Sequence, residues 1–358
     1  MRSAAFIFLL TVSACLVAEA KVDAVHKPHQ PDKREGIERE IYLGNFEKCS
    51  FNLEYTLEGG RIVRKKWGDY FFGLGLGYSP KNGGWNKWDF LQVYAQTKAG
   101  VVNVLERSRP VLFLGYSSGG SDILAAEWLT DEGKRLRLRF VSAPSHPEWL
   151  FLRVDFSELK VRDIVLSAYP GNAAAAEGRE RHFATRERDW NLAAEGADLA
   201  PQFPAILLYS RFKDDRFGNK LVYDAASVAR VTCGKASTLV SVRFTPKADA
   251  KTADFALGYF AHRDPSDQVV RFLGEDADTI HAFLRAIDWQ AVPDRADFQQ
   301  SVRIALKLGI DTKVLNAIAA RYLAAAKRGD VETVAGCFAE VEALRREKVR
   351  SGLSAFAR

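Results

Sequence analysis

A serine within a glycine-rich pentapeptide is the sharpest chemical motif in the sequence. Gly115-Tyr116-Ser117-Ser118-Gly119 matches the G-x-S-x-G pattern of the nucleophile elbow in serine hydrolases, and it follows the apolar run 111–114. In that interpretation Ser117 is the nucleophile, and it sits on a strand-to-helix turn. Residues 121–130 then form the next helix, and residues 136–143 form the next strand.

The residues around the motif favour a hairpin turn instead. In an α/β-hydrolase the strand at 136–143 is covered by helices on both faces and is therefore apolar on both. Here Arg135, Arg137 and Arg139 occupy alternate positions. The preceding segment 62–107 shows no helical period, although that fold requires a strand–helix–strand unit there. We therefore expect a β-hairpin and keep a serine esterase that uses Ser117 as the alternative.

Two further clusters contain side chains that suit a carbohydrate ligand. In the first, Trp85 and Trp88 lie close to the turn residues Asn82, Gly83 and Gly84. Aromatic faces exposed on the loops of a β scaffold stack on sugar rings, while neighbouring polar groups bind the hydroxyls. Packing in the core explains such aromatics equally well.

The second cluster runs from Tyr169 to Trp190 and is rich in arginine. It contains Arg179, Arg181, His182, Arg186 and Arg188. Guanidinium groups bind carboxylates and sulfates in a bidentate manner, and a tyrosine or histidine beside them can move a proton during uronate cleavage. Solvated charges on an exposed loop are the alternative. The two clusters predict a carbohydrate site without a metal or cofactor, made by Trp85, Trp88, Tyr169, Arg181, His182 and Trp190.

The elements that must position these residues are mostly β-strands. From about Ile41 to His262, short runs of β-prone residues with a period of two are separated by turn residues, as antiparallel strands with one exposed face require. After about Gly274 the period becomes helical. We expect helices at 276–287, 295–308, 312–327 and 331–350. The predicted fold is a large antiparallel β-sandwich at 41–272, followed by an α-helical C-terminal region at 273–358.

Two segments also carry a family resemblance. Val161–Trp190, with Leu166-Ser167-Ala168-Tyr169-Pro170-Gly171 and Arg181-His182-Phe183-Ala184-Thr185, and Thr238–Phe260 resemble uncharacterised exported bacterial proteins of the galactose mutarotase-like β-supersandwich type. The resemblance implies a two-sheet sandwich that in relatives binds, epimerises or cleaves carbohydrate. No catalytic residue set of that superfamily can be placed on this sequence, so it does not decide whether the protein is an enzyme.

The N-terminal twenty residues have the layout of a secretory signal. Basic Arg2 precedes an apolar stretch, and Ala18-Glu19-Ala20 forms a small-x-small cleavage site before Lys21. The apolar stretch is too short to span a bilayer, so we expect no membrane span in the mature protein. Residues 21–40 form a polar linker. We expect a periplasmic or secreted protein, with a lipid anchor on Cys15, in Val12-Ser13-Ala14-Cys15, as the alternative.

Charge and cysteine content limit the remaining possibilities. The net charge of +6 favours acidic partners, but the basic residues are spread along the chain and do not indicate nucleic acid. Cys49, Cys233 and Cys337 are too few for a disulfide scaffold; the first two could form one bridge, and Cys337 shares an apolar helical face. A structural or interaction protein of the cell envelope, with the helical region as its docking element, is a further alternative.

Overall fold

The structure is a computed structural model of the chain. It describes residues 39–45, 49–55, 57–58, 61–62, 65–67, 70–72, 74–80, 87–169, 180–212, 215–236, 239–259, 271–291 and 295–356. The predicted signal segment, Cys15 and nearly all of the predicted linker lie outside these residues. The chain forms two compact units. The larger contains the described residues up to Phe113 and Asp122–Ile287, and the smaller contains Leu114–Ser121 and the described part of Asp288–Arg358.

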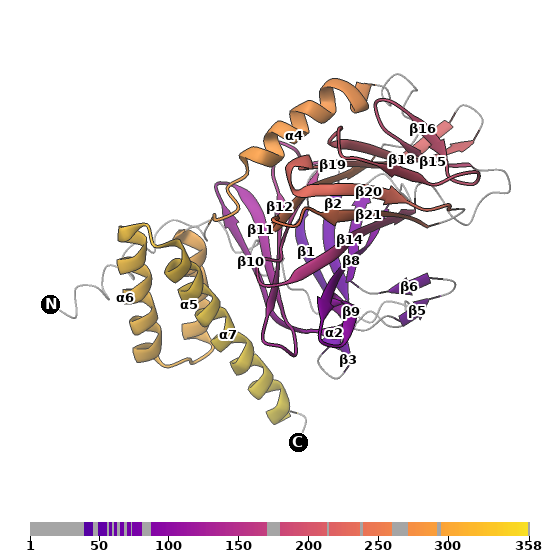
Figure 1. Ribbon diagram of the computed structural model, residues 1–358. Helices are drawn as coiled ribbons and strands as arrows, with labels where there is room; N and C mark the ends of the chain where they lie inside the picture. The colour runs from indigo at the N-terminus through magenta and orange to yellow at the C-terminus, as the bar shows by residue number, and fades with distance from the viewer. Residues whose placement is uncertain are drawn as a thin grey trace. The chain divides into compact units, whose positions relative to one another are not determined.

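Two large sheets form most of the fold (Figure 1). All strand pairs whose register is described are antiparallel. The first sheet has the order β1 (Arg39–Asn45), β2 (Cys49–Tyr55), β7 (Leu74–Pro80), β8 (Lys87–Thr97), β14 (Lys160–Tyr169), β21 (Val240–Pro246), β20 (Val228–Cys233) and β17 (Ala197–Leu199), with β9 (Gly100–Asn103) also paired to β8.

The second sheet has the order β10 (Arg109–Ser118), β11 (Ser121–Leu129), β12 (Arg135–Ser142), β13 (Leu150–Asp155), β22 (Thr252–Tyr259), β19 (Asp215–Tyr223), β18 (Ala205–Phe212), β15 (Glu180–Ala184) and β16 (Asp189–Asn191). Two small hairpins pair β3 (Leu57–Glu58) with β4 (Arg61–Ile62) and β5 (Lys65–Trp67) with β6 (Tyr70–Phe72). The prediction of a large antiparallel sandwich is confirmed.

The alternation of side chains along the strands explains why the two sheets pack together. In β12, Leu136, Leu138 and Phe140 are fully buried and face the other sheet. The arginines between them lie on the outer face, where Arg137 pairs with Glu158 at 2.7 Å. Because every second residue of β12 is apolar, this strand buries one side and leaves the other to charged pairs.

Strand β13 departs from this alternation because a helix covers its outer face. Phe151 in β13 is fully buried although its neighbours Leu150 and Leu152 already face the core. The ring of Phe283, from α4 (Ala277–Ala286), lies 4.9 Å from the ring of Phe151. Helix α4 continues η2 (Phe272–Asp276), and it packs on β19 and β22 within the larger unit. Short helical turns occur at α2 (Val104–Arg107) and η1 (Ala225–Ser227).

The smaller unit contains three helices in its described part: α5 (Arg295–Lys307), α6 (Thr312–Arg328) and α7 (Val331–Phe356). Asp311 caps the first turn of α6, and Gly329 ends that helix in the left-handed conformation at φ +68°. The predicted helical C-terminal region is therefore confirmed. No helix in the described part of the chain combines the length and the apolar content that crossing a membrane requires.

The strand order of the first sheet rules out a disulfide between Cys49 and Cys233, which the sequence had left open. Cys49 lies in β2 and Cys233 in β20, and β7, β8, β14 and β21 lie between these strands. Five strand spacings place the two residues about 24 Å apart, whereas a disulfide requires Cα atoms within about 7 Å. Cys233 is a buried free thiol.

Candidate functional site

The pentapeptide around Ser117 forms the end of a β-hairpin. Gly119 and Gly120 make a two-residue turn with φ values of +57° and +82°, as a type I′ turn requires, and strand β11 follows in place of a helix. The backbone N–H of Ser117 donates to Asp297 Oδ2 at 2.7 Å, and the Tyr116 hydroxyl donates to the Ala291 carbonyl at 2.9 Å. These contacts tie the hairpin end to the residues around α5. The hairpin prediction is confirmed, and the esterase alternative is wrong because the nucleophile-elbow geometry is missing.

Trp88 is the tryptophan of the first cluster whose side chain the structure describes. Trp85 lies outside the described residues, as does the side chain of Tyr169. Trp88 is fully buried, and its indole N–H crosses the core to donate to the Gly258 carbonyl of the second sheet at 2.9 Å. Trp88 therefore links the two sheets, and it has no ring face open to a sugar.

The described arginines of the second cluster each turn to a different partner. Buried Arg181 donates to Ser210 Oγ at 2.7 Å. Arg186 donates to the Leu273 carbonyl at 3.0 Å, and Arg188 pairs with Glu195 at 2.6 Å. These three arginines do not meet at one anion-binding site.

His182 and Trp190 lie close together at the edge of the second sheet. Trp190 packs edge-on against Phe183, with ring centroids 5.5 Å apart, and is largely buried. His182 is buried on the outer side of the sheet, between the carboxylates of Asp189 at 3.0 Å and Glu180 at 3.2 Å. Because these carboxylates bind opposite ring nitrogens, they do not converge on one point as metal ligands must.

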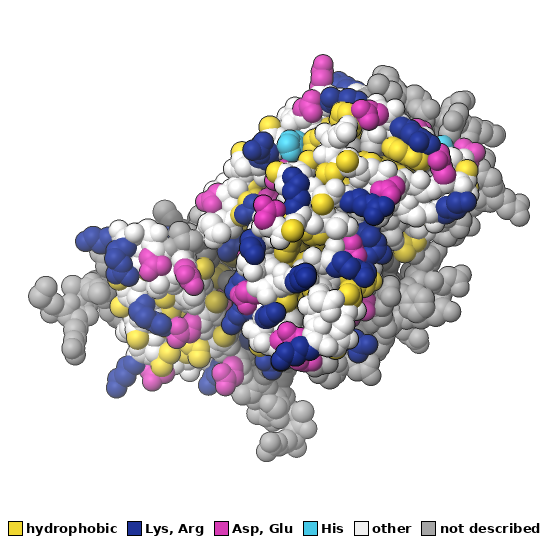
Figure 2. Space-filling model, in the orientation of Figure 1, with side chains coloured by type: hydrophobic (Ala, Val, Ile, Leu, Met, Phe, Trp, Pro, Cys, Tyr) yellow, Lys and Arg dark blue, Asp and Glu magenta, His cyan; other side chains and the backbone are white. Residues whose placement is uncertain are grey.

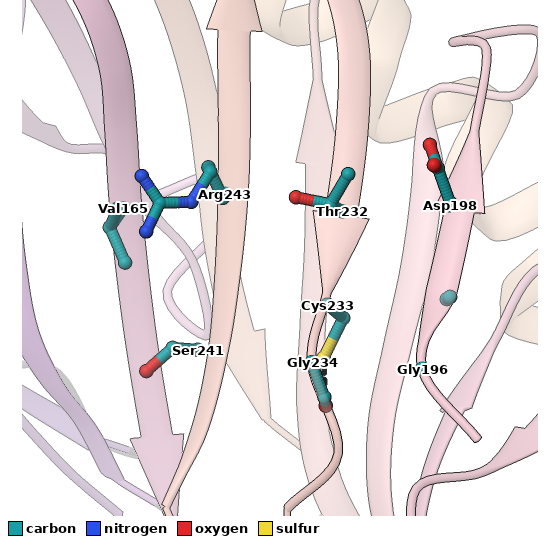
Figure 3. A pocket seen from close by; sticks show the side chains of 9 residues that line it. Val165, Gly196, Asp198, Thr232, Cys233, Gly234, Ser241 and Arg243 are labelled. Carbon is teal, nitrogen blue, oxygen red and sulfur yellow. Dashed lines mark hydrogen bonds between the residues drawn. The ribbon is translucent and has the colours of Figure 1, made fainter.

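A pocket on the outer face of the first sheet was not expected from the sequence. Its volume is about 520 Å³, and it lies over β14, β21, β20 and β17 (Figure 3). The lining residues are Val165, Gly196, Ala197, Asp198, Thr232, Cys233, Gly234, Ser241 and Arg243.

The sheet register explains how residues far apart in the sequence line one pocket. Val165, Arg243, Thr232 and Asp198 are direct partners on four successive strands. They therefore form one row across the outer face. In the next row toward the strand ends, Ser241 and Ser167 are paired and their hydroxyls lie 2.8 Å apart.

The charged groups of this face bind one another. Asp163 is 5% exposed and accepts hydrogen bonds from Arg243 at 2.7 Å, Arg162 at 2.8 Å and Thr245 at 3.0 Å. At the other side, Arg230 binds Asp198 through both carboxylate oxygens. The hydrogen bond and charge of Arg230 hold the pKa of Asp198 below its ordinary value. Asp198 therefore stays ionised as an acceptor at the pocket wall.

This arrangement suits binding better than acid–base hydrolysis. Asp163 and Asp198 lie three strands apart, which is about 14 Å, whereas the two carboxylates of a glycosidase lie about 5 to 9.5 Å apart. Burial raises the pKa of the Cys233 thiol to about 12, so the thiol is protonated and weakly nucleophilic. The pocket offers hydroxyls, a carboxylate and a guanidinium beside apolar Val165.

Comparisons with known proteins found similarity in structure but none in sequence. The sequence matches no protein-family model and no curated protein sequence. An α-N-acetylgalactosaminidase, NagBb, from Bifidobacterium bifidum is 7% identical, over 71% of this chain and 41% of that chain, with a TM-score of 0.41. A "putative aldose 1-epimerase" from Klebsiella pneumoniae subsp. pneumoniae is 10% identical, over 68% of this chain and 91% of that one, with a TM-score of 0.38.

A bacterial glucoamylase complexed with acarbose is 10% identical, with a TM-score of 0.32, over 70% of this chain and 38% of that one. The chain thus spans less than half the length of the galactosaminidase and of the glucoamylase. The activities in these names are properties of those proteins.

Proposed function

We propose that the protein is an exported carbohydrate-binding protein, and that the pocket on the outer face of its first sheet holds a neutral saccharide. The observation that carries this proposal is the row Val165, Arg243, Thr232 and Asp198, with its neighbour Ser241. Saccharide sites combine a few fixed polar groups with apolar surface, and a volume of about 520 Å³ lies in the range of small-molecule sites.

The existing ion pairs favour a neutral ligand over a uronate or sulfated one. Arg243 already binds Asp163, which Arg162 binds as well, and Arg230 already binds Asp198. An incoming carboxylate would have to compete with these aspartates for the guanidinium groups. A sugar hydroxyl can instead donate to an aspartate and accept from an arginine without disturbing either pair.

Occlusion of the pocket is the direct test. A Cβ atom added at Gly234 meets no atom within 4 Å, so a side chain can start there without a clash, and Gly234→Leu adds apolar bulk at the pocket. We expect the unmodified protein to be retarded by a neutral polysaccharide in affinity gel electrophoresis, and Gly234→Leu to migrate freely. Gly336→Leu is the matched control, because Gly336 on α7 is equally open.

The same gels distinguish the alternatives. Retardation of Gly234→Leu equal to that of the unmodified protein would remove the pocket as the site. Retardation by uronate-containing or sulfated polymers alone, weakening with salt, would contradict the neutral-ligand argument and favour an arginine-based site. If the protein binds none of these polymers, the hypothesis of a structural or interaction protein of the cell envelope is favoured.

Export has its own test, because it rests on the N-terminal sequence. The proposal expects intact-mass analysis of protein from the cell envelope or medium to give a chain that starts at Lys21. A chain that starts at lipid-modified Cys15 would show an anchored protein, and a chain that retains residues 1–20 would contradict export.

A further inference from the structure

His182 is held by ionisable side chains from three strands of the second sheet. Its Nδ1 lies 3.0 Å from Asp189 Oδ1 on β16, and its Nε2 lies 3.2 Å from Glu180 Oε2 on β15 itself. On β18, the ring of Tyr209 stacks on the imidazole at 4.7 Å, and its hydroxyl donates to the second oxygen of Asp189. Glu180, Asp189 and Tyr209 are the titratable groups that face His182 among the described residues.

This geometry requires the protonated form of the imidazole. Both nitrogens face carboxylate oxygens, which only accept hydrogen bonds. The imidazolium has two N–H groups and satisfies both partners, whereas neutral imidazole has one and would turn a lone pair toward the other carboxylate. Loss of the proton therefore breaks one of the two contacts.

The electrostatic environment favours the same form. Burial alone would lower the pKa of His182, but the hydrogen bonds and charges of Asp189 and Glu180 outweigh burial and raise the pKa above its ordinary value. The resulting stabilisation is fully present below the unfolded-state pKa of about 6.5. It is lost as the pH rises through the higher folded-state pKa.

Strand β16, which His182 contacts through Asp189, leads directly to the pocket. Strand β16 ends at Asn191, and the chain then crosses to the first sheet, where Gly196, Ala197 and Asp198 line the pocket. Hydrogen bonds hold the start of this crossing. The Leu192 N–H donates to the Arg181 carbonyl at 2.7 Å. The carbonyl of Leu192 in turn accepts from the Ala236 N–H at 3.0 Å.

We propose that His182 is a pH-sensitive latch. In its protonated state it holds β16 against β15 and β18. It thereby fixes the crossing 192–196, which leads into β17 at the wall of the pocket. The latch is a property of the fold and stands without any ligand. Its consequence for binding, a wall that loosens as the pH rises, rests on the proposed function.

Hydrogen exchange of the whole protein tests the latch without a ligand. We expect the amides of 189–199 to lose protection several-fold between about pH 6 and about pH 8.5, after correction for intrinsic exchange, because His182 loses its proton as the pH rises above the ordinary histidine pKa of about 6.5. In His182→Gln the protection of this segment should be the same at both pH values. His146→Gln is the matched control and should retain the pH dependence, because His146 packs against Phe151 and Phe283, away from β16.

A milder variant covers the case in which His182→Gln does not fold. Glu180 is half exposed, and Glu180→Gln removes one of the charges that raise the pKa of His182. The loss of protection should then occur at lower pH. Unchanged protection of 189–199 across the interval in the unmodified protein, or the same pH dependence in His182→Gln, would overturn the latch. Neither result would bear on whether the pocket binds a saccharide.

Discussion

Replacement of Trp88 by phenylalanine separates a structural role from a ligand-binding role. Trp88 is fully buried, and its indole N–H donates to Gly258 across the sandwich. Loss of this hydrogen bond costs about 1 kcal/mol, and the smaller ring leaves a partial cavity that costs about another 1 kcal/mol. We expect Trp88→Phe to lower the unfolding free energy by about 2 kcal/mol, which for a unit of this size lowers Tm by about 4–8 °C.

Differential scanning fluorimetry beside the polysaccharide gels provides the measurement. Trp190→Phe is the control, because Trp190 lies at the sheet edge and is 9% exposed, so its neighbours and water can fill the space. Its Tm should fall less than that of Trp88→Phe. A Tm for Trp88→Phe within about 1 °C of the unmodified protein would refute the bridging argument. Loss of saccharide binding at unchanged Tm would instead make Trp88 a ligand contact.

Two further outcomes are expected. The protein should not react with a fluorophosphonate probe, because Ser117 lies in a hairpin and not on a strand-to-helix turn; labelling that Ser117→Ala abolishes would reinstate a nucleophile. Cys233 should react with a thiol reagent at neutral pH only after unfolding, since burial raises its pKa to about 12; rapid labelling of the folded protein would show that the wall at β20 opens.

Most of the fold could be predicted because it follows from the local periodicity of apolar residues in the sequence. The alternation of Leu136, Leu138 and Phe140 with arginines specifies a strand with one buried face, and β12 has that pattern. Gly329 and Asp330 predict the turn between α6 and α7 because glycine accepts the left-handed conformation and aspartate caps a helix. The burial of Phe151 could not be predicted, because it depends on α4, which is more than a hundred residues away in the sequence.

The candidate site was harder to predict because a pocket on a sheet depends on strand order. Val165, Thr232 and Arg243 are unremarkable in the sequence, and they become neighbours only because β14, β21 and β20 are adjacent. Ser241, Arg243 and Thr245 do alternate with buried residues, which marks an exposed polar face. That signal finds the face, but it does not find the strands beside it. Tryptophans and arginines drew attention instead, and Trp88 and Arg181 proved to be buried.

The difference between the two outer faces of the sandwich gives a physical reason for the position of the pocket. The second sheet presents Phe151 on its outer face and has Trp149 beside it, and apolar surface of this kind is stabilised when it is covered. Phe272 of η2 and Phe283 of α4 supply the cover, with ring centroids 6.0 Å from Trp149 and 4.9 Å from Phe151.

The outer face of the first sheet around Arg243 gains nothing from such a cover. Thr232, Ser241 and Arg243 would lose hydration beneath a helix and would need new partners there. Acidic and basic side chains are likewise interspersed over the face of the molecule in Figure 2. A polar strip that is hollowed between β14 and β17 can exchange its water for the hydroxyls of a ligand at little cost. The covered face therefore serves stability, and the hollowed polar face between β14 and β17 is the one on which binding is expected.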